Sequence, residues 1–443
     1  MPVAKLLLTM SVPMMISMLV QALYNIVDSM FVAKLSENAL TAVSLAFPVQ
    51  NLMIAVGTGT GVGINALVSR ALGEKKNEYA NSAVNNGIYL AIFSFIGFAI
   101  VCGFFAPAFF SVQTDDPQIL AYGVDYVRVI GIMSFGLFIQ LCAEKLLQST
   151  GKTIYSMATQ LIGAVINIIL DPIMIFGLFG FPRMEVTGAA LATVTGQIIA
   201  AVIGVIMNIK LNKELHISLV KYKLNGEVIR HIYSVGFPSI IMASVGSVMT
   251  FGMNKILMGF TSTATAVFGV YFKLQSFIFM PVFGLNNGVT PIIAYNYGAQ
   301  NRERVVSAIR HVVTYAVIVM LLGLAAFQLL PRQLLLMFDA SETMLTLGIP
   351  ALRIISLSFV LASFGVAASG AFQALGKSIY SMYVSVARQL VVLLTAAFLL
   401  AQTGRVELVW WAFPIAELVS FAMSVIFMVH INRKIISKIG KKS

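Results

Sequence analysis

Two carboxylates in the first half of this sequence, Asp28 and Asp171, lie inside apolar stretches long enough to cross a bilayer. An ionisable side chain costs at least about 2.5–3.5 kcal/mol in such a stretch, which makes each aspartate a candidate functional residue. Asn167 precedes Asp171 by one helical turn, so the two side chains share a helix face. Pro172 lacks a backbone N–H and leaves the carbonyl of Ile168 free, as is common beside ion sites in membrane helices.

These residues are expected at a similar depth in the outer half of the membrane. Counting from the cytoplasmic ends of their spans, Asp28 lies about 33 Å and Asp171 about 26 Å along the helix axis, and Thr193 lies about 10 Å below an outer end. Two carboxylates, an amide and a hydroxyl offer oxygen ligands only. Asp28, Asn167, Asp171 and Thr193 are therefore predicted to bind a hard cation such as Na⁺, or a proton.

The alternative is a purely structural ion pair, for which Arg128 is the obvious base, although Arg128 could equally extend to the membrane surface. Its counterpart in the second half of the chain, Arg353, faces no matching acid, because Met253 and Ala396 stand where the aspartates would repeat. This asymmetry favours the cation or proton site.

Polar residues in other spans are assigned to a substrate cavity. Glu417, about 16 Å down the last span, holds a cationic substrate or bonds locally to Ser420. Lys273 binds substrate or pairs with a carboxylate such as Glu417. Both pairs of alternatives stay open at this point. Gln50 and Gln275, at matching positions of the two halves, complete the expected cavity.

The composition is that of a polytopic membrane protein. Of 443 residues, 59% are hydrophobic and only 10% are charged, against about a quarter charged in soluble proteins. The formal net charge is +12, but the basic residues lie in short loops and at the C-terminus. That placement indicates membrane orientation, and no nucleic-acid partner is expected.

The chain repeats itself at one constant spacing. The decapeptide that begins at Gln148 returns at Gln373, so that Gly151 matches Gly376. Its Gly-Lys-Thr and Gly-Lys-Ser resemble the end of a phosphate-binding loop, but Leu146 and Ala371 occupy the position where that loop requires glycine. The decapeptide is instead interpreted as a short turn between two membrane helices.

Twelve apolar runs predict an all-α membrane protein with six spans per repeat. They cover residues 6–33, 40–69, 82–108, 119–147, 153–178, 186–209, 231–259, 263–296, 305–329, 344–373, 379–402 and 406–431. An even number of spans per repeat predicts two parallel six-helix lobes related by pseudo-two-fold symmetry. The predicted domains are an N-lobe at 1–209, a cytoplasmic linker at 210–230 and a C-lobe at 231–443. Lys and Arg gather on the side that carries both termini, so both termini are expected in the cytoplasm and the protein in the cell membrane.

At this point the sequence resembles a known family. The run from Asn167 to Pro172, Gly188-Ala-Ala-Leu-Ala-Thr193, and the long motif from Tyr271 to Gly298 are similar to the multidrug and toxic compound extrusion (MATE) transporters, in the MepA-type branch. The resemblance implies a cation-coupled exporter of lipophilic cations, with an N-lobe cation site at Asp28, Asn167, Asp171 and Thr193. Some members use acids in spans 7 and 10, which this sequence lacks.

The sequence therefore predicts an H⁺- or Na⁺-coupled multidrug antiporter that works by alternating access and needs no cofactor beyond the coupling ion. Its expected partners are small lipophilic cations and the lipid bilayer, and a monomer is expected. The alternative is a flippase for lipid-linked saccharide precursors, whose pyrophosphate would require several basic residues in the cavity. No metal cluster, nucleophile–base motif or selectivity filter favours an enzyme or a channel.

Overall fold

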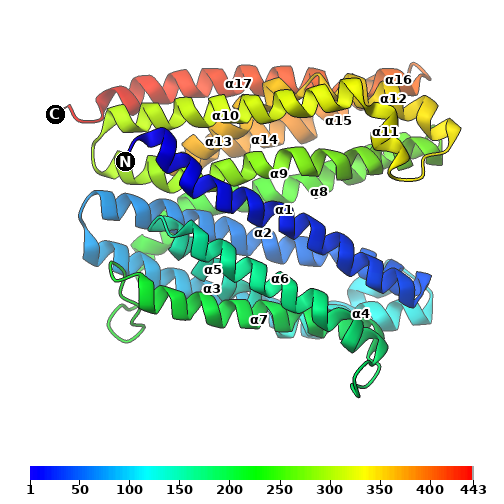
Figure 1. Ribbon diagram of the computed structural model, residues 1–443, viewed down its shortest axis with the longest axis horizontal. Coiled ribbons are helices and arrows are strands. Elements are labelled where there is room, and N and C mark those ends of the chain that lie inside the picture. The colour runs from blue at the N-terminus through cyan, green and yellow to red at the C-terminus, as the bar shows by residue number, and fades with distance from the viewer. Residues whose placement is uncertain (442–443) are drawn as a thin grey trace. The chain divides into compact units, whose positions relative to one another are not determined.

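The computed structural model describes residues 1–441, and every regular element in that range is helical (Figure 1). The first repeat contains α1 (Val3–Leu35), α2 (Glu37–Gly73), α3 (Asn77–Ser111), α4 (Pro117–Ile132), α5 (Phe135–Ser149), α6 (Thr153–Phe176) and α7 (Glu185–Leu211). The second contains α8 (Gly226–Met258), α9 (Ser262–Gly298), α10 (Arg302–Leu329), α11 (Pro331–Leu336), α12 (Glu342–Ser356), α13 (Phe359–Ala374), α14 (Ser378–Val386), the π-helix η1 (Ala387–Leu393), α15 (Leu394–Ala401), α16 (Val406–Val409), α17 (Ala412–Lys434) and the short η2 (Ile436–Lys438).

Ten helices of the described chain are long and apolar enough to cross a membrane, and the number is twelve if each of two bent pairs counts as one span. The bent pairs are α4 with α5, at 47°, and α12 with α13, at 50°. At each break the backbone makes shorter-range hydrogen bonds, from Ser134 to Gly131 and from Ser358 to Ile355, which allow the change of direction. The prediction of an all-α fold with twelve spans is confirmed, and two of the spans are broken helices.

The helix ends repeat with the same spacing as the sequence. The Ser36 side chain accepts a hydrogen bond from the N–H of Ala39 at the start of α2, and Thr261 caps α9 in the same way. Asp116 caps α4 and Ser341 caps α12 through the same kind of bond. Within each pair, the two capping residues are separated by the spacing that relates the two copies of the decapeptide. The two halves therefore begin these helices at equivalent positions.

The echoed decapeptide forms a helix–turn–helix junction in both halves. Gly151 and Gly376 have φ angles of 78° and 73°, a left-handed conformation that favours glycine. The following Lys152 N–H donates to the carbonyl of Leu147 at 2.8 Å, and the Lys377 N–H donates to that of Phe372 at 2.7 Å. These bonds close the last turns of α5 and α13 in the way typical of glycine-terminated helices.

The helices pack into two compact units. The N-terminal unit is Ile16–Ile240, and the C-terminal unit is Met1–Met15 together with Ile241–Ser443. The beginning of α1 thus packs with the second repeat and the beginning of α8 with the first. The N-lobe at 1–209, the linker at 210–230 and the C-lobe at 231–443 stay a prediction.

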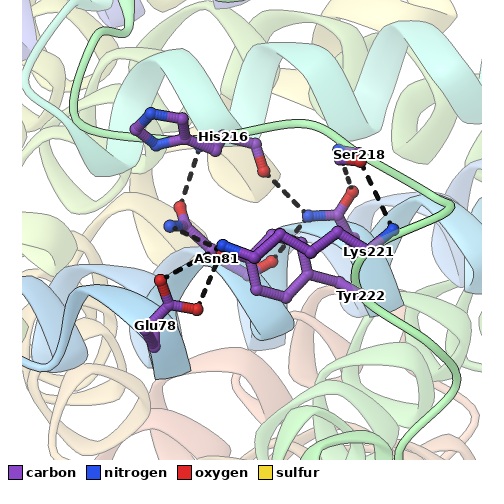
Figure 2. A network of polar contacts seen from close by, with 7 residues as sticks. Glu78, Asn81, His216, Ser218, Lys221 and Tyr222 are labelled. Atoms are coloured by element: carbon purple, nitrogen blue, oxygen red, sulfur yellow. Dashed lines mark hydrogen bonds and ion pairs between the residues drawn. The ribbon is translucent and has the colours of Figure 1, made fainter.

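The linker between α7 and α8 is fastened to α3 by buried asparagines (Figure 2). The Asn81 side-chain oxygen accepts from the His216 N–H at 2.8 Å. The Asn85 amide donates to the His216 carbonyl at 2.9 Å and accepts from the Ser218 N–H at 2.8 Å. The Tyr222 hydroxyl donates to Glu78 at 2.9 Å. The linker is therefore an ordered part of the N-terminal unit.

Candidate functional site

The four residues of the predicted cation site meet inside the N-terminal unit, on α1, α6 and α7. With its amide oriented to suit its neighbours, Asn167 donates to the Asp171 carboxylate at 3.0 Å. Its side-chain oxygen accepts from the Thr193 N–H at 2.8 Å and from the Thr193 hydroxyl at 3.1 Å. The carboxyl groups of Asp28 and Asp171 lie within hydrogen-bonding reach of each other. The consecutive helices α6 and α7 thus meet the distant α1, which brings all four side chains together.

This site is shielded from solvent and incompletely satisfied. Asp171 is 0% exposed, and Asn167 and Thr193 are also buried. Among the described residues, one carboxyl oxygen of Asp28 and one of Asp171 are buried without a hydrogen-bond partner. Two neighbouring carboxylates repel each other unless a proton or a cation lies between them. The arrangement can therefore hold a small cation or a shared proton through oxygen atoms alone.

Two tyrosines extend the site. The Tyr24 hydroxyl lies within hydrogen-bonding reach of Thr193, and Tyr24 stands one helical turn before Asp28. Tyr126 on α4 lies near Asp28 and accepts a hydrogen bond from the Gln50 amide at 2.8 Å. Gln50 was assigned to the substrate cavity, and the structure places it against this tyrosine on the border of the cation site.

Close packing of α6 on α7 positions Asn167 and Thr193 (Figure 1). A Cβ atom at Gly196 on α7 would approach the carbonyl oxygen of Gly163 on α6 to 2.6 Å and the Cβ of Asn167 to 3.3 Å. Only glycine at position 196 lets the backbones come this near, as is common between membrane helices. The short distance between helices then allows the small Thr193 side chain to reach the Asn167 amide.

No basic side chain neutralises the aspartates within the described chain. The ion pairs formed by residues 1–441 include neither Asp28 nor Asp171. Arg128, which sequence reasoning weighed as a structural partner, is exposed, and its Nε donates to the carbonyl of Gly103 at 3.2 Å. The structural ion pair with Arg128 is therefore absent.

The cavity residues expected in the second repeat do not form one cluster. Glu417 on α17 pairs with Arg388, with 3.2 Å between Oε2 and Nη1. Lys273 on α9 is exposed, and its Nζ lies 6.0 Å from the centre of the Phe338 ring, so it is not the partner of Glu417. Gln275 accepts a hydrogen bond from the Tyr271 hydroxyl, and Tyr271 lies near both Glu417 and Arg388.

The structure shows polar residues in apolar helices that the sequence analysis does not single out. Arg388 lies well inside the predicted span 379–402, so the cost of a charge within a span marks it as a candidate functional residue. Glu144 is also buried, near the end of α5, where its carboxylate accepts from the Gln140 amide at 2.9 Å. Tyr24 shares a helix face with Asp28, a spacing that the sequence does show.

Comparison with known families supports the repeat and identifies the fold. The profile of the family described as MatE matches residues 13–173 and 238–398. The two matched segments are equally long, and their first residues have the same spacing as the two copies of the decapeptide and the paired helix caps. They cover more than half of the chain.

Curated relatives and solved structures agree with this assignment. The chain is 27% identical over 440 residues to the "Multidrug export protein MepA" of Staphylococcus haemolyticus (strain JCSC1435), covering 98% of this chain and 95% of the relative. It is 26% identical to the protein of that name from Staphylococcus aureus (strain MRSA252), over 98% of this chain and 94% of the relative.

Among solved structures, one described as "Outward-facing conformation of a multidrug resistance MATE family transporter of the MOP superfamily" has a TM-score of 0.92 at 25% identity. It covers 100% of this chain and 98% of its own. A structure described as "Crystal structure of MATE in the straight conformation" has the same TM-score and identity over the same coverage. The family consists of transporters, which confirms that the protein is not an enzyme. The chain belongs to the MATE family of multi-pass membrane transporters.

Proposed function

We propose that this transporter exports lipophilic cations in exchange for H⁺ or Na⁺, and that the ion binds at Asp28, Asn167, Asp171 and Thr193. The observation that carries the proposal is the contact between two largely buried carboxyls, each with an unsatisfied oxygen, without a basic partner in the described chain. A proton or a small cation supplies the missing positive charge.

Ion binding at this site drives transport only if the ion binds one arrangement of the protein more tightly than another. A ligand with equal affinity for both arrangements does not shift the equilibrium between them. The residues that bind the ion come from α1, α6 and α7. A movement of any one of these helices changes the distances between the ligating oxygens. Ion affinity then depends on the arrangement, and release of the ion on one side of the membrane can be coupled to export of the substrate.

The proposed substrates are lipophilic cations such as dyes and quaternary ammonium compounds. The acids of the first repeat and the 23 Met and 31 Phe side chains of the chain suit ligands that combine positive charge with apolar surface. The names of the curated relatives describe multidrug export, which agrees with a range of compounds rather than one.

We further propose that the protein lies in the cell membrane as a monomer with both termini in the cytoplasm. The distribution of Lys and Arg supports this orientation, because short cytoplasmic loops are enriched in basic residues. The linker between α7 and α8 carries Lys210, Lys213, Lys221, Lys223 and Arg230 and belongs on the cytoplasmic side.

The test is efflux of a fluorescent cation from vesicles that contain the purified protein, with a pH gradient and a Na⁺ gradient imposed separately. Asp28→Asn and Asp171→Asn keep the size of each side chain but remove its charge, so both variants are expected to lose gradient-driven efflux. Asn167→Ala removes one neutral ligand and is expected to weaken coupling less. Rates are compared per inserted molecule, which separates a transport defect from poor insertion.

Two results would overturn the proposal. Wild-type rates for both Asp→Asn variants would show that the carboxylates have no role in coupling. Resistance limited to anionic compounds, or rescue of a defect in flipping lipid-linked saccharides, would replace the antiporter with the flippase function.

A further inference from the structure

A partly buried ion pair lies inside the C-terminal unit, between Arg388 on η1 and Glu417 on α17. Nη1 of Arg388 stands 3.2 Å from Oε2 of Glu417. The Glu417 side chain is 8% exposed and that of Arg388 30%. The Glu417 side chain is therefore largely enclosed by protein, and Arg388 is the more exposed partner.

The pair lies near the positions of the second repeat that match Asn167 and Thr193 of the first. By the spacing that relates the two repeats, Thr193 corresponds to Leu418 and Asn167 to Val392. Glu417 directly precedes the first of these positions, and Arg388 stands one helical turn before the second. Arg388 and Glu417 thus lie on the helices that match α6 and α7 of the first repeat. The positions that match Asp28 and Asp171 themselves are the apolar Met253 and Ala396.

The backbone departs from the repeat at the residue that carries the positive charge. Residues Ala387–Leu393 form a π-helix, while the matching residues 162–168 belong to the regular helix α6. A π-turn inserts an extra residue and turns the following side chains by about 100° around the axis. Because such turns are rare and concentrate at functional sites, this local change points to a specific placement of Arg388.

Oxygen atoms of Glu417 and of two serines on the same helix lie close to Gly365 on α13. A Cβ atom at Gly365 on α13 would lie 3.8 Å from Glu417 Oε1, 3.5 Å from Ser420 Oγ and 3.8 Å from Ser424 Oγ. Three oxygens therefore converge where glycine presents no side chain. The Ser424 hydroxyl is buried and has no hydrogen-bond partner in the described chain. A carboxylate and two hydroxyls suit an alkali cation as they suit a guanidinium.

We propose that this cluster is a monovalent cation site whose resident cation is the guanidinium of Arg388. The C-terminal unit then takes up no diffusible ion, and an alkali cation binds at Glu417 only when Arg388 is removed. The statement that wild type keeps one exchangeable site, in the N-terminal unit, rests on the proposed function. The assignment of Arg388 as a tethered cation does not.

The test measures thermal unfolding of the full-length protein in detergent. All variants carry Asp28→Asn and Asp171→Asn, which remove the two carboxylates of the proposed ion site in the N-terminal unit. The midpoint temperature of unfolding is measured at increasing concentrations of NaCl or KCl. Choline chloride keeps the ionic strength constant. The background protein is expected to show no specific effect of Na⁺ or K⁺. Addition of Arg388→Gln is expected to make the midpoint rise and then saturate with one of these ions, by mass action.

Two further variants identify the ligand. Glu417→Gln added to Arg388→Gln is expected to abolish the ion effect, and Arg388→Lys, which keeps a resident charge, is expected to show none. Arg388→Gln that responds to neither ion, or whose stability rises only when the pH falls, would overturn the proposal. So would an ion effect that survives Glu417→Gln.

A second measurement covers the case in which Arg388→Gln does not fold. Arg388→Ala leaves a space shaped for a guanidinium, so methylguanidinium added during solubilisation is expected to restore monodisperse protein, while methylammonium restores less. The same treatment of Arg388→Ala with Glu417→Gln is expected to have no effect. Equal yields with and without methylguanidinium would refute the resident-cation assignment.

Discussion

Asn85→Ala is expected to release the linker from α3 while leaving the rest of the protein folded. Asn85 is fully buried and makes two bonds to the linker, to the His216 carbonyl at 2.9 Å and from the Ser218 N–H at 2.8 Å. A third bond, at 2.8 Å, stays within α3, to the carbonyl of Asn81. Alanine removes both linker bonds and leaves the two backbone groups of the linker without these partners.

The size of the effect follows from the number of bonds lost. Each bond contributes about 1–1.5 kcal/mol net, so opening of the linker becomes easier by about 2–3 kcal/mol. If a protease cleaves only the open form, and the linker recloses faster than it is cut, the cleavage rate follows the open population. The rate should then rise about 30- to 150-fold, since about 1.4 kcal/mol corresponds to a factor of ten.

Limited trypsin digestion of the purified protein in detergent measures this rate, because the linker carries Lys213, Lys221 and Lys223 as cleavage sites. Loss of the intact chain is followed with time, and mass spectrometry locates the first cut. The control is Asn77→Ala, an exposed asparagine in the first turn of the same helix. A rate for Asn85→Ala within twofold of wild type, or an equal increase for Asn77→Ala, would refute the reasoning.

Three further predictions follow. A cysteine introduced as Lys221→Cys should react with a membrane-impermeant reagent only after cells are opened, whereas Gln333→Cys should react in intact cells; labelling of Lys221→Cys from outside would reverse the topology. Gly196→Ala should destabilise the protein by about 1–3 kcal/mol through its clash with Gly163, and it should slow cation-driven efflux. Gly97→Ala should do neither, because an added Cβ there meets nothing within 4 Å. Equal unfolding midpoints for the two variants would contradict this prediction. Cells that produce the protein should resist quaternary ammonium dyes and remain sensitive to anionic compounds of similar size, as growth inhibition would show.

Patterns within single stretches of sequence determined the architecture of this protein. Apolar runs predicted twelve spans, because the length of each run can be read from the sequence and compared directly with the thickness of a bilayer. The constant spacing between matching residues predicted the two repeats, which the helix caps and the left-handed Gly151 and Gly376 reproduce. The same reasoning identified Asp28 and Asp171, because a charge in an apolar run is visible without any knowledge of its neighbours.

Only the tertiary structure decided which of these charges meet. Asp28 and Asp171 lie far apart in the sequence, and their contact depends on how α1 packs against α6. Tyr126 joins them from α4, although a tyrosine in an apolar helix gives no signal of its own. From the sequence, Lys273 was considered as the partner of Glu417, whereas the structure pairs Glu417 with Arg388. The π-turn at Arg388 changes the direction of side chains without changing the hydrophobic pattern, so it could not be foreseen. Pairing between helices is a property of packing, and a repeat in sequence predicts equivalent positions without predicting what the side chains there contact.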